Sequence, residues 1–132
     1  MKPKLLFIDD DPLMHALYKP HLERAGFEVI SLLDGVEALE VASREQPVAM
    51  VVDMVLPGPD GLAIILVLKA AETTKKIPII AISANLNLRD VRQQLEGVGV
   101  AAFLSKPFGA AKLVSEIIRL DQNSHGTVAS QS

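Results

Sequence analysis

The amino-acid sequence predicts an α/β fold, a doubly wound five-stranded parallel sheet with helices on both faces. Five short runs rich in Val, Ile, Leu or Phe recur along the chain, and segments of helical length separate them. Strands that are apolar throughout are buried on both faces, and each right-handed crossover between parallel strands places a helix over the sheet. The five runs cover residues 4–8, 27–31, 48–52, 77–82 and 100–104.

The first helix, predicted over residues 13–25, follows the first strand. Asp11 is placed to cap it, and Pro12 falls in the first turn, where the missing N–H of proline costs nothing. Pro20 lies inside the helix and predicts a kink. Gly26 is placed to end it, because glycine tolerates the left-handed conformation common at helix ends.

The second helix has Asp34 as its candidate N-cap, with Ala38, Leu39 and Ala42 on one face. The fourth helix ends at a glycine pair, Gly97 and Gly99. We expect residues 121–132, which are polar, small and aperiodic, to form a disordered C-terminal tail after one domain, residues 1–120.

The third helix, LAIILVLKAA, has more apolar residues than one buried face needs. Leu62, Ile65 and Leu68 share the face that it would bury, which leaves Leu66 and Val67 outside. Contiguous apolar area at a surface commonly marks a contact surface. We therefore expect a homodimer or partner interface here, and the alternative is a wider buried face.

Charge and composition exclude several classes of function. The chain has 132 residues, with 13 Lys and Arg against 16 Asp and Glu, whereas binding to a phosphate backbone normally needs a strongly basic surface. We expect no direct nucleic-acid binding. The sequence has no cysteine, which excludes disulfides and thiolate metal sites and fits a cytoplasmic location. We also expect no membrane segment, since a span needs about 18 consecutive apolar residues.

Polar side chains follow the apolar runs where each strand ends. The carboxyl ends of parallel strands share one edge of the sheet, and ligands bind where the strand order reverses. Carboxylates that converge there repel one another unless a cation lies among them. The residues at these ends are Asp9, Asp10 and Asp11 after the first run, Asp53 after the third, Ser83 after the fourth and Lys106 after the fifth.

This set predicts a Mg²⁺ site that supports phosphoryl transfer. Carboxylate oxygens without His or Cys ligands favour hard cations, and a few carboxylates completed by water and phosphate oxygens suit Mg²⁺ best. Lys106 and Ser83 supply a positive charge and a hydrogen-bond donor for a phosphoryl group. Asp53 can act as the nucleophile that forms an acyl phosphate, while Asp9 and Asp10 hold the metal. His15, His21 and His125 lack site spacing, and we expect them at the surface.

Together these motifs closely resemble the receiver domain of bacterial two-component response regulators, of the single-domain chemotaxis type. The resemblance implies a flavodoxin-like sheet of strand order 2-1-3-4-5. It also implies a phosphoprotein switch, whose only catalysis is its own phosphorylation and dephosphorylation. It rests on Asp9-Asp10, on Asp53 followed by Leu56-Pro57 and Asp60-Gly61, on Ser83-Ala84 and on Lys106-Pro107.

The resemblance assigns the phosphorelay chemistry. It implies that Asp53 accepts a phosphoryl group from a phosphohistidine on a sensor histidine kinase or a histidine phosphotransfer protein. Asp10 and Asp53 would bind Mg²⁺ directly and Asp9 largely through water, with the backbone carbonyl of Val55 completing the protein ligands. The side chain of Val55 lies where many relatives carry a polar group near the hydrolytic water, so we expect slow self-hydrolysis.

The resemblance also implies a switch. Ser83 and Lys106 would contact the phosphoryl oxygens, and the Lys106-Pro107 bond would be cis. Phe103 matches the switch aromatic of the family, and its ring would enter space that Ser83 vacates, changing the surface that a downstream protein target recognises. Because Phe103 lacks the hydroxyl of a tyrosine, packing alone would decide its position.

Two alternatives compete with this interpretation. A phosphorylation-independent pseudo-receiver would bind a partner, but it would not need the acceptor, acid pair, hydroxyl and lysine together. A phosphatase of the haloacid dehalogenase class would use Asp9 and Asp11 as its DxD motif. That class needs a further acidic pair after the lysine, where this chain offers only Glu116 and Asp121. The cognate kinase, the target and whether the chain stands alone stay open.

Overall fold

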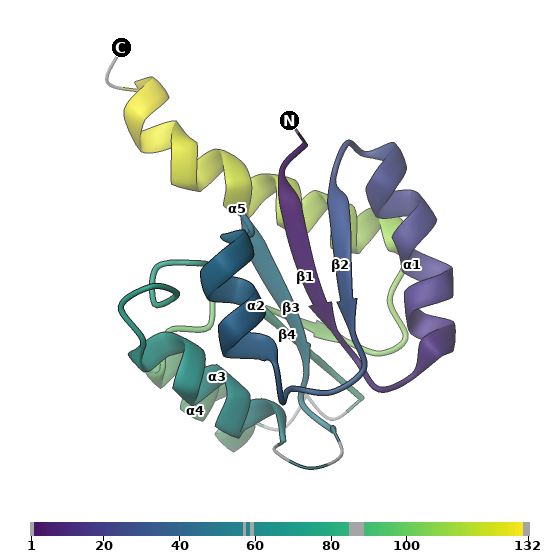
Figure 1. The fold of residues 1–132 in the computed structure, drawn as a ribbon, viewed down its shortest axis with the longest axis vertical. Helices are drawn as coiled ribbons and strands as arrows, with labels where there is room; N and C mark the ends of the chain where they lie inside the picture. The colour runs from purple at the N-terminus through teal and green to yellow at the C-terminus, as the bar shows by residue number, and fades with distance from the viewer. Residues whose placement is uncertain (1, 57, 59, 85–88, 131–132) are drawn as a thin grey trace.

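The computed structural model describes residues 2–56, 58, 60–84 and 89–130. Five parallel strands form one sheet in the order β2-β1-β3-β4-β5, with helices on both faces (Figure 1). The strands are β1 (Lys4–Ile8), β2 (Glu28–Leu32), β3 (Ala49–Asp53), β4 (Ile79–Ser83) and β5 (Ala102–Ser105), and the helices are α1 (Pro12–Arg24), α2 (Ala38–Glu45), α3 (Gly61–Ala70), α4 (Arg89–Gly97) and α5 (Ala110–Ser130). The predicted fold class and strand order are confirmed, with strand boundaries within two residues.

The sheet separates two apolar cores. Alternate residues of each strand point to opposite faces, so in β1 Leu5 and Phe7 belong to one core and Leu6 and Ile8 to the other. Helices α1 and α5 cover the first face, and α2, α3 and α4 cover the second. Because β1 and β3 are covered on both sides, residues 5–8 of β1 and 49–52 of β3 are all apolar, and this continuous run is the pattern that predicts a buried strand.

Helix α1 begins and ends as predicted. The side chain of Asp11 accepts a hydrogen bond from the N–H of Leu13 at 2.9 Å, and Pro12 is the first helical residue. Gly26 follows the helix with a φ of 103°, in the left-handed region that favours glycine. The helix continues through Pro20, and a bend at that residue stays a prediction.

The predicted N-cap of α2 was wrong. Asp34 accepts a hydrogen bond from the N–H of Val36 at 3.0 Å, which closes a local turn, and α2 begins later, at Ala38. An aspartate can satisfy a nearby N–H in a turn as well as at a helix start, so the residue type alone did not distinguish the two.

The C-terminal segment was also predicted incorrectly. Helix α5 continues to Ser130, whereas the sequence predicted a tail without regular structure after Leu120. The yellow end of the helix extends beyond the edge of the sheet in Figure 1. Extending an existing helix costs far less than nucleating one, and no proline follows Leu120 to stop it. Within the described part of the chain, no helix combines the length and apolar character that crossing a membrane requires.

Candidate phosphoryl-acceptor and metal site

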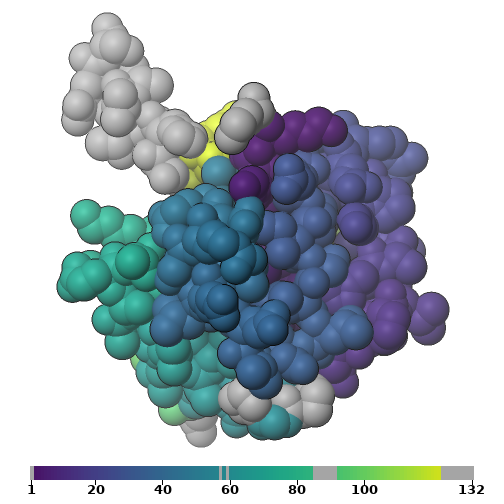
Figure 2. Space-filling view, in the orientation of Figure 1, coloured from purple at the N-terminus to yellow at the C-terminus, as the bar shows by residue number. Residues whose placement is uncertain are grey.

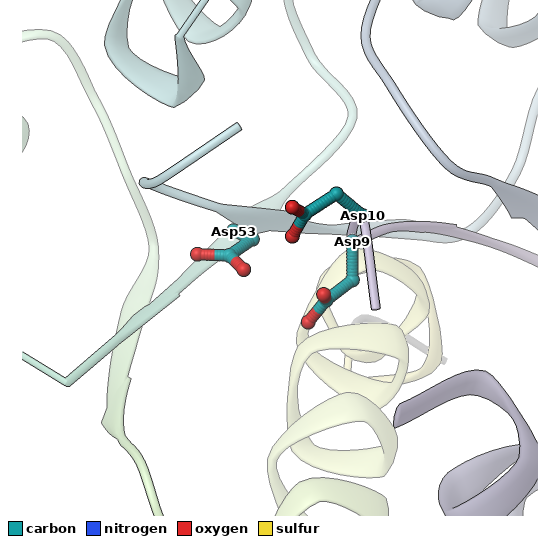
Figure 3. Close-up of side chains that lie close together, drawn as sticks. All are labelled: Asp9, Asp10 and Asp53. Carbon is teal, nitrogen blue, oxygen red and sulfur yellow. The ribbon is translucent and has the colours of Figure 1, made fainter. Parts of the chain in front are cut away.

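Three carboxylates gather at the carboxyl ends of β1 and β3. The two strands are neighbours in the sheet, with Ile8 opposite Val52, so the residues that follow them lie at the same edge. Asp9, Asp10 and Asp53 each place a carboxylate oxygen within 4.8 Å of the others (Figure 3). This convergence was predicted on condition that the first and third strands are neighbours, as the resemblance implied, and the pairing of β1 with β3 meets that condition.

The three carboxylates differ in their exposure to water. Asp9 is fully buried and Asp53 is 2% exposed, whereas Asp10 is exposed. Burial raises the pKa of the Asp9 carboxyl, and the charge of Asp53 raises it further, although a hydrogen bond from the N–H of Asp11 at 2.9 Å opposes both. The Oδ1 of Asp53 accepts a hydrogen bond from the N–H of Val55 at 2.9 Å. Two carboxylates are therefore held in fixed orientations by the backbone.

Lys106 supplies the positive charge at this edge. Its Nζ lies 2.9 Å from Asp53 Oδ2 and 3.2 Å from Asp9 Oδ2. Burial lowers the pKa of Lys106, but the hydrogen bond to Asp53 and the charges of Asp53 and Asp9 outweigh burial, so the pKa lies above its ordinary value. The N–H of Lys106 donates to the carbonyl of Ser83 at 2.9 Å, which joins the ends of β4 and β5. Ser83 itself is buried.

The donor set fits Mg²⁺. Within the described residues, Asp9 Oδ2 is buried and ion-paired with Lys106 but receives no hydrogen bond. One lysine faces two buried carboxylates, so the site retains negative charge that a cation would neutralise. Oxygen ligands without nitrogen or sulfur are the ligands that Mg²⁺ prefers.

The start of α3 lies directly against the strand that carries Asp53. Asp60 caps the helix by accepting a hydrogen bond from the N–H of Ala63 at 2.9 Å. Gly61 is the first helical residue, and a Cβ there would overlap the carbonyl oxygen of Asp53 and the Cα of Met54. The Asp60-Gly61 motif is therefore explained by capping and close backbone packing. Pro57, another residue of the motif, lies outside the described residues.

His15 was not predicted to be part of this region. It is 8% exposed, its Nε2 donates to the backbone carbonyl of Asp9 at 2.7 Å, and its ring lies against that of Phe7. The prediction of a surface histidine was therefore wrong for His15, although His21 is exposed as expected. His15, Tyr18 and Leu22 are the buried residues of α1, and their helical spacing was the signal that marks His15 as inward-facing. The side chain of His125 lies outside the described part.

The residues assigned to the switch lie beside this edge. Phe103 is half-buried in β5 opposite Ala81, and the guanidinium carbon of Arg92 lies 5.0 Å from the centre of its ring. The Lys106-Pro107 bond is cis. Val55 is 65% exposed, which leaves its side chain at the mouth of the site.

This geometry matches one protein family. The family model of the response regulator receiver domain covers residues 5–118. The chain belongs to the receiver-domain family. The match confirms the resemblance drawn from the aspartates, the serine and the lysine at the strand ends. Receiver domains of two-component systems interact with histidine kinases and with downstream targets.

Individual relatives show how far the similarity extends. The receiver is 34% identical over 130 residues to the transcriptional regulatory protein PrrA of Mycobacterium bovis, covering 98% of this chain and 54% of PrrA. It is 30% identical over 117 residues to the polar-differentiation response regulator DivK of Brucella ovis, covering 89% of this chain and 94% of DivK. This chain thus spans about half the length of the first curated relatives it matches, and nearly all of DivK.

A solved structure with the same fold is the receiver domain of sensor histidine kinase PA1611 from Pseudomonas aeruginosa. It superimposes with a TM-score of 0.82 at 29% identity, covering 92% of this chain and 98% of that domain. That crystal structure has a magnesium ion coordinated in the active-site cleft.

Proposed function

We propose that this receiver accepts a phosphoryl group on Asp53 in a Mg²⁺-dependent reaction. The observation that carries the proposal is the contact of Lys106 Nζ with both Asp53 and Asp9, beside a third carboxylate, Asp10. A carboxylate nucleophile, a fixed lysine and an acidic metal site are the parts that transfer to an aspartate requires.

In the proposed reaction each residue of the site would have a distinct role. Asp53 would attack the phosphorus of a phosphohistidine, the bond between phosphorus and the imidazole nitrogen would break, and the imidazole would leave. Lys106 would move its hydrogen bond from Asp53 to a phosphoryl oxygen, and Ser83 would donate to another. Asp9, Asp10, Asp53 and the carbonyl of Val55 would hold Mg²⁺, which neutralises charge on the carboxylates and the phosphoryl oxygens. The magnesium ion in the PA1611 receiver supports this assignment.

The phosphoryl donor would be a sensor histidine kinase or a histidine phosphotransfer protein, and the output would be a changed protein-binding surface around Phe103. The protein would catalyse only its own phosphorylation and dephosphorylation, in the cytoplasm. PrrA is named as a transcriptional regulatory protein. The part of PrrA that this chain matches is only 54% of its length, and the formal net charge here is -3, so we propose contacts with proteins and none with nucleic acid.

The direct test is intact-mass measurement after incubation with acetyl phosphate and Mg²⁺. We expect the protein to gain one phosphoryl group, and we expect no gain for Asp53→Asn or with a chelator. Asp34→Asn is the matched control, because Asp34 is an exposed aspartate at the end of another strand. An adduct that survives in Asp53→Asn would contradict the assigned acceptor. No adduct, together with no binding of beryllofluoride, would favour the pseudo-receiver.

The lifetime of the adduct tests the role of Val55. An apolar, 65% exposed side chain two residues after Asp53 offers no group to orient a hydrolytic water. We expect slow loss of the phosphoryl group after the donor is removed, and faster loss for Val55→Asn. A half-life of seconds in the wild-type protein would contradict this expectation.

A further inference from the structure

An apolar groove lies between α2 and α3, away from the acceptor site. Its volume is about 410 Å³, and Val36 and Leu39 line one side while Ala63 and Val67 line the other. Val36 is 74% exposed, Leu39 37% and Val67 50%, and the neighbouring Leu66 is 46% exposed. Figure 2 shows α2 in blue beside α3 in teal on the same face of the molecule. The alternative of a wider buried face for α3 is therefore incorrect at Leu66 and Val67.

Contacts at both ends of the groove hold α2 against α3. A Cβ at Gly35 would overlap the side chain of Ile64, so glycine allows the loop before α2 to lie directly on α3. At the other end, the hydroxyls of Ser43 and Thr73 share a hydrogen bond of 2.8 Å, and the side chain of Gln46 donates to the carbonyl of Thr73 at 2.9 Å. Contacts at both ends thus fix α2 relative to α3.

Charge changes sign along the groove. At the start of α2, Asp34, Glu37 and Glu40 are exposed. The opposite end carries Arg44 on α2, with Lys75 and Lys76 in the loop after α3. Arg44 lies 3.8 Å from Glu40 and 3.0 Å from Glu45, and Lys75 lies 2.8 Å from Glu72, whereas Lys76 makes no ion pair with the residues that the structure describes. Among the described residues beside the groove, the exposed charges outside these ion pairs are Asp34 and Glu37 at the start of α2, which form an acidic end, and Lys76 at the other end, which is the basic end.

We propose that a second copy of this chain docks on the groove, antiparallel, about a two-fold axis. In such a contact the same patch meets itself reversed, so the acidic end of one copy faces the basic end of the other. The exposed apolar side chains Leu39, Leu66 and Val67 would meet near the axis. A partner of uniform charge would complement only one end, whereas a reversed copy complements both. The proposal does not depend on phosphorylation of Asp53.

Sedimentation equilibrium over a range of protein concentrations tests this proposal, without a phosphodonor. We expect a reversible dimer whose dissociation constant rises at least tenfold in Leu66→Glu. Leu17→Glu is the matched control, since Leu17 is 55% exposed on α1, at the opposite face of the sheet, and we expect no change. A monomer at millimolar concentration, or a dimer weakened by Leu17→Glu and not by Leu66→Glu, would overturn the proposal.

A charge exchange tests the antiparallel orientation. Glu37→Lys alone places a positive charge against the basic end of the other copy and should weaken the dimer. Adding Lys76→Glu should restore the affinity to within about threefold of wild type, because the opposite charges again face each other. Failure of the double variant to recover, with both variants folded by circular dichroism, would exclude this orientation.

Discussion

Replacing Lys106 with Met is expected to lower the free energy of unfolding by about 3 kcal/mol at pH 7.5 in metal-free buffer. The substitution leaves Asp9 and Asp53 buried at the same edge without a positive charge. Removing one partner of a buried ion pair costs about 3–5 kcal/mol, and we take the lower end because the Lys106 side chain is 25% exposed. Urea denaturation measures the change, and Lys112→Met is the control, since Lys112 is exposed on α5.

The loss should depend on pH. Burial already raises the pKa of Asp9 in the folded protein above its unfolded value, so the stability that Asp9 contributes is present at low pH and is lost as the pH rises through the folded pKa. Without Lys106 that pKa rises further, so the variant should differ most from wild type at pH 7.5 and least near pH 4. An equal loss at both pH values would show that lost packing, not charge, is the cause. Added Mg²⁺ should reduce the difference in free energy of unfolding between the variant and the wild type at pH 7.5, because the ion restores positive charge at the site and binds only the folded state.

Gly61→Ala should destabilise the protein and disturb the end of β3, where Asp53 lies. The new Cβ would overlap the backbone of Asp53 and Met54, so α3 or the end of β3 must move. Overpacking of this kind costs about 1–3 kcal/mol, and the better helix propensity of alanine returns less than about 1 kcal/mol. We expect a net loss of about 1–2 kcal/mol in urea denaturation and weaker Mg²⁺ binding by calorimetry, because the Asp53 carboxylate moves with its backbone.

Gly97→Ala provides the matched control for Gly61→Ala. Gly97 is also helical, at the end of α4, and a Cβ there meets nothing within 4 Å. This substitution should be neutral or stabilising by up to about 1 kcal/mol and should leave Mg²⁺ binding unchanged. If Gly61→Ala proved as stable as Gly97→Ala, α3 would be able to move without lowering the free energy of unfolding, and this prediction would be wrong.

The sequence was most informative where burial is nearly complete. The strands were recognised because both faces of the sheet are covered, so each run is apolar, and polar residues such as Asp53 then mark where a strand ends. The convergence of Asp9 with Asp53 followed from the pairing of β1 and β3. That pairing was expected from the resemblance to receiver domains, because apolar runs do not encode the order of strands.

The features that the sequence did not predict depend on tertiary contacts. His15 bonds to the carbonyl of Asp9, a backbone atom that no residue type reveals. Asp34 accepts a hydrogen bond within a turn. An aspartate side chain can do the same at the start of a helix, so the residue type alone did not distinguish the two. The groove requires α2 and α3 to lie side by side, and only Leu66 and Val67, outside the expected buried face, indicated a surface there.

The position of Lys106 late in the chain has a consequence for folding. Strands β1, β3 and β4 can pair before β5 is available, but Asp9 and Asp53 would then approach each other without their lysine. Like-charge repulsion would oppose burial of that edge until β5 joins the sheet, where the backbone of Lys106 bonds to Ser83 and its ammonium reaches both carboxylates. An N-terminal intermediate that lacks β5 is thus destabilised by the two carboxylates of the candidate site. The electrostatics of the site favour an all-or-none folding transition for the domain.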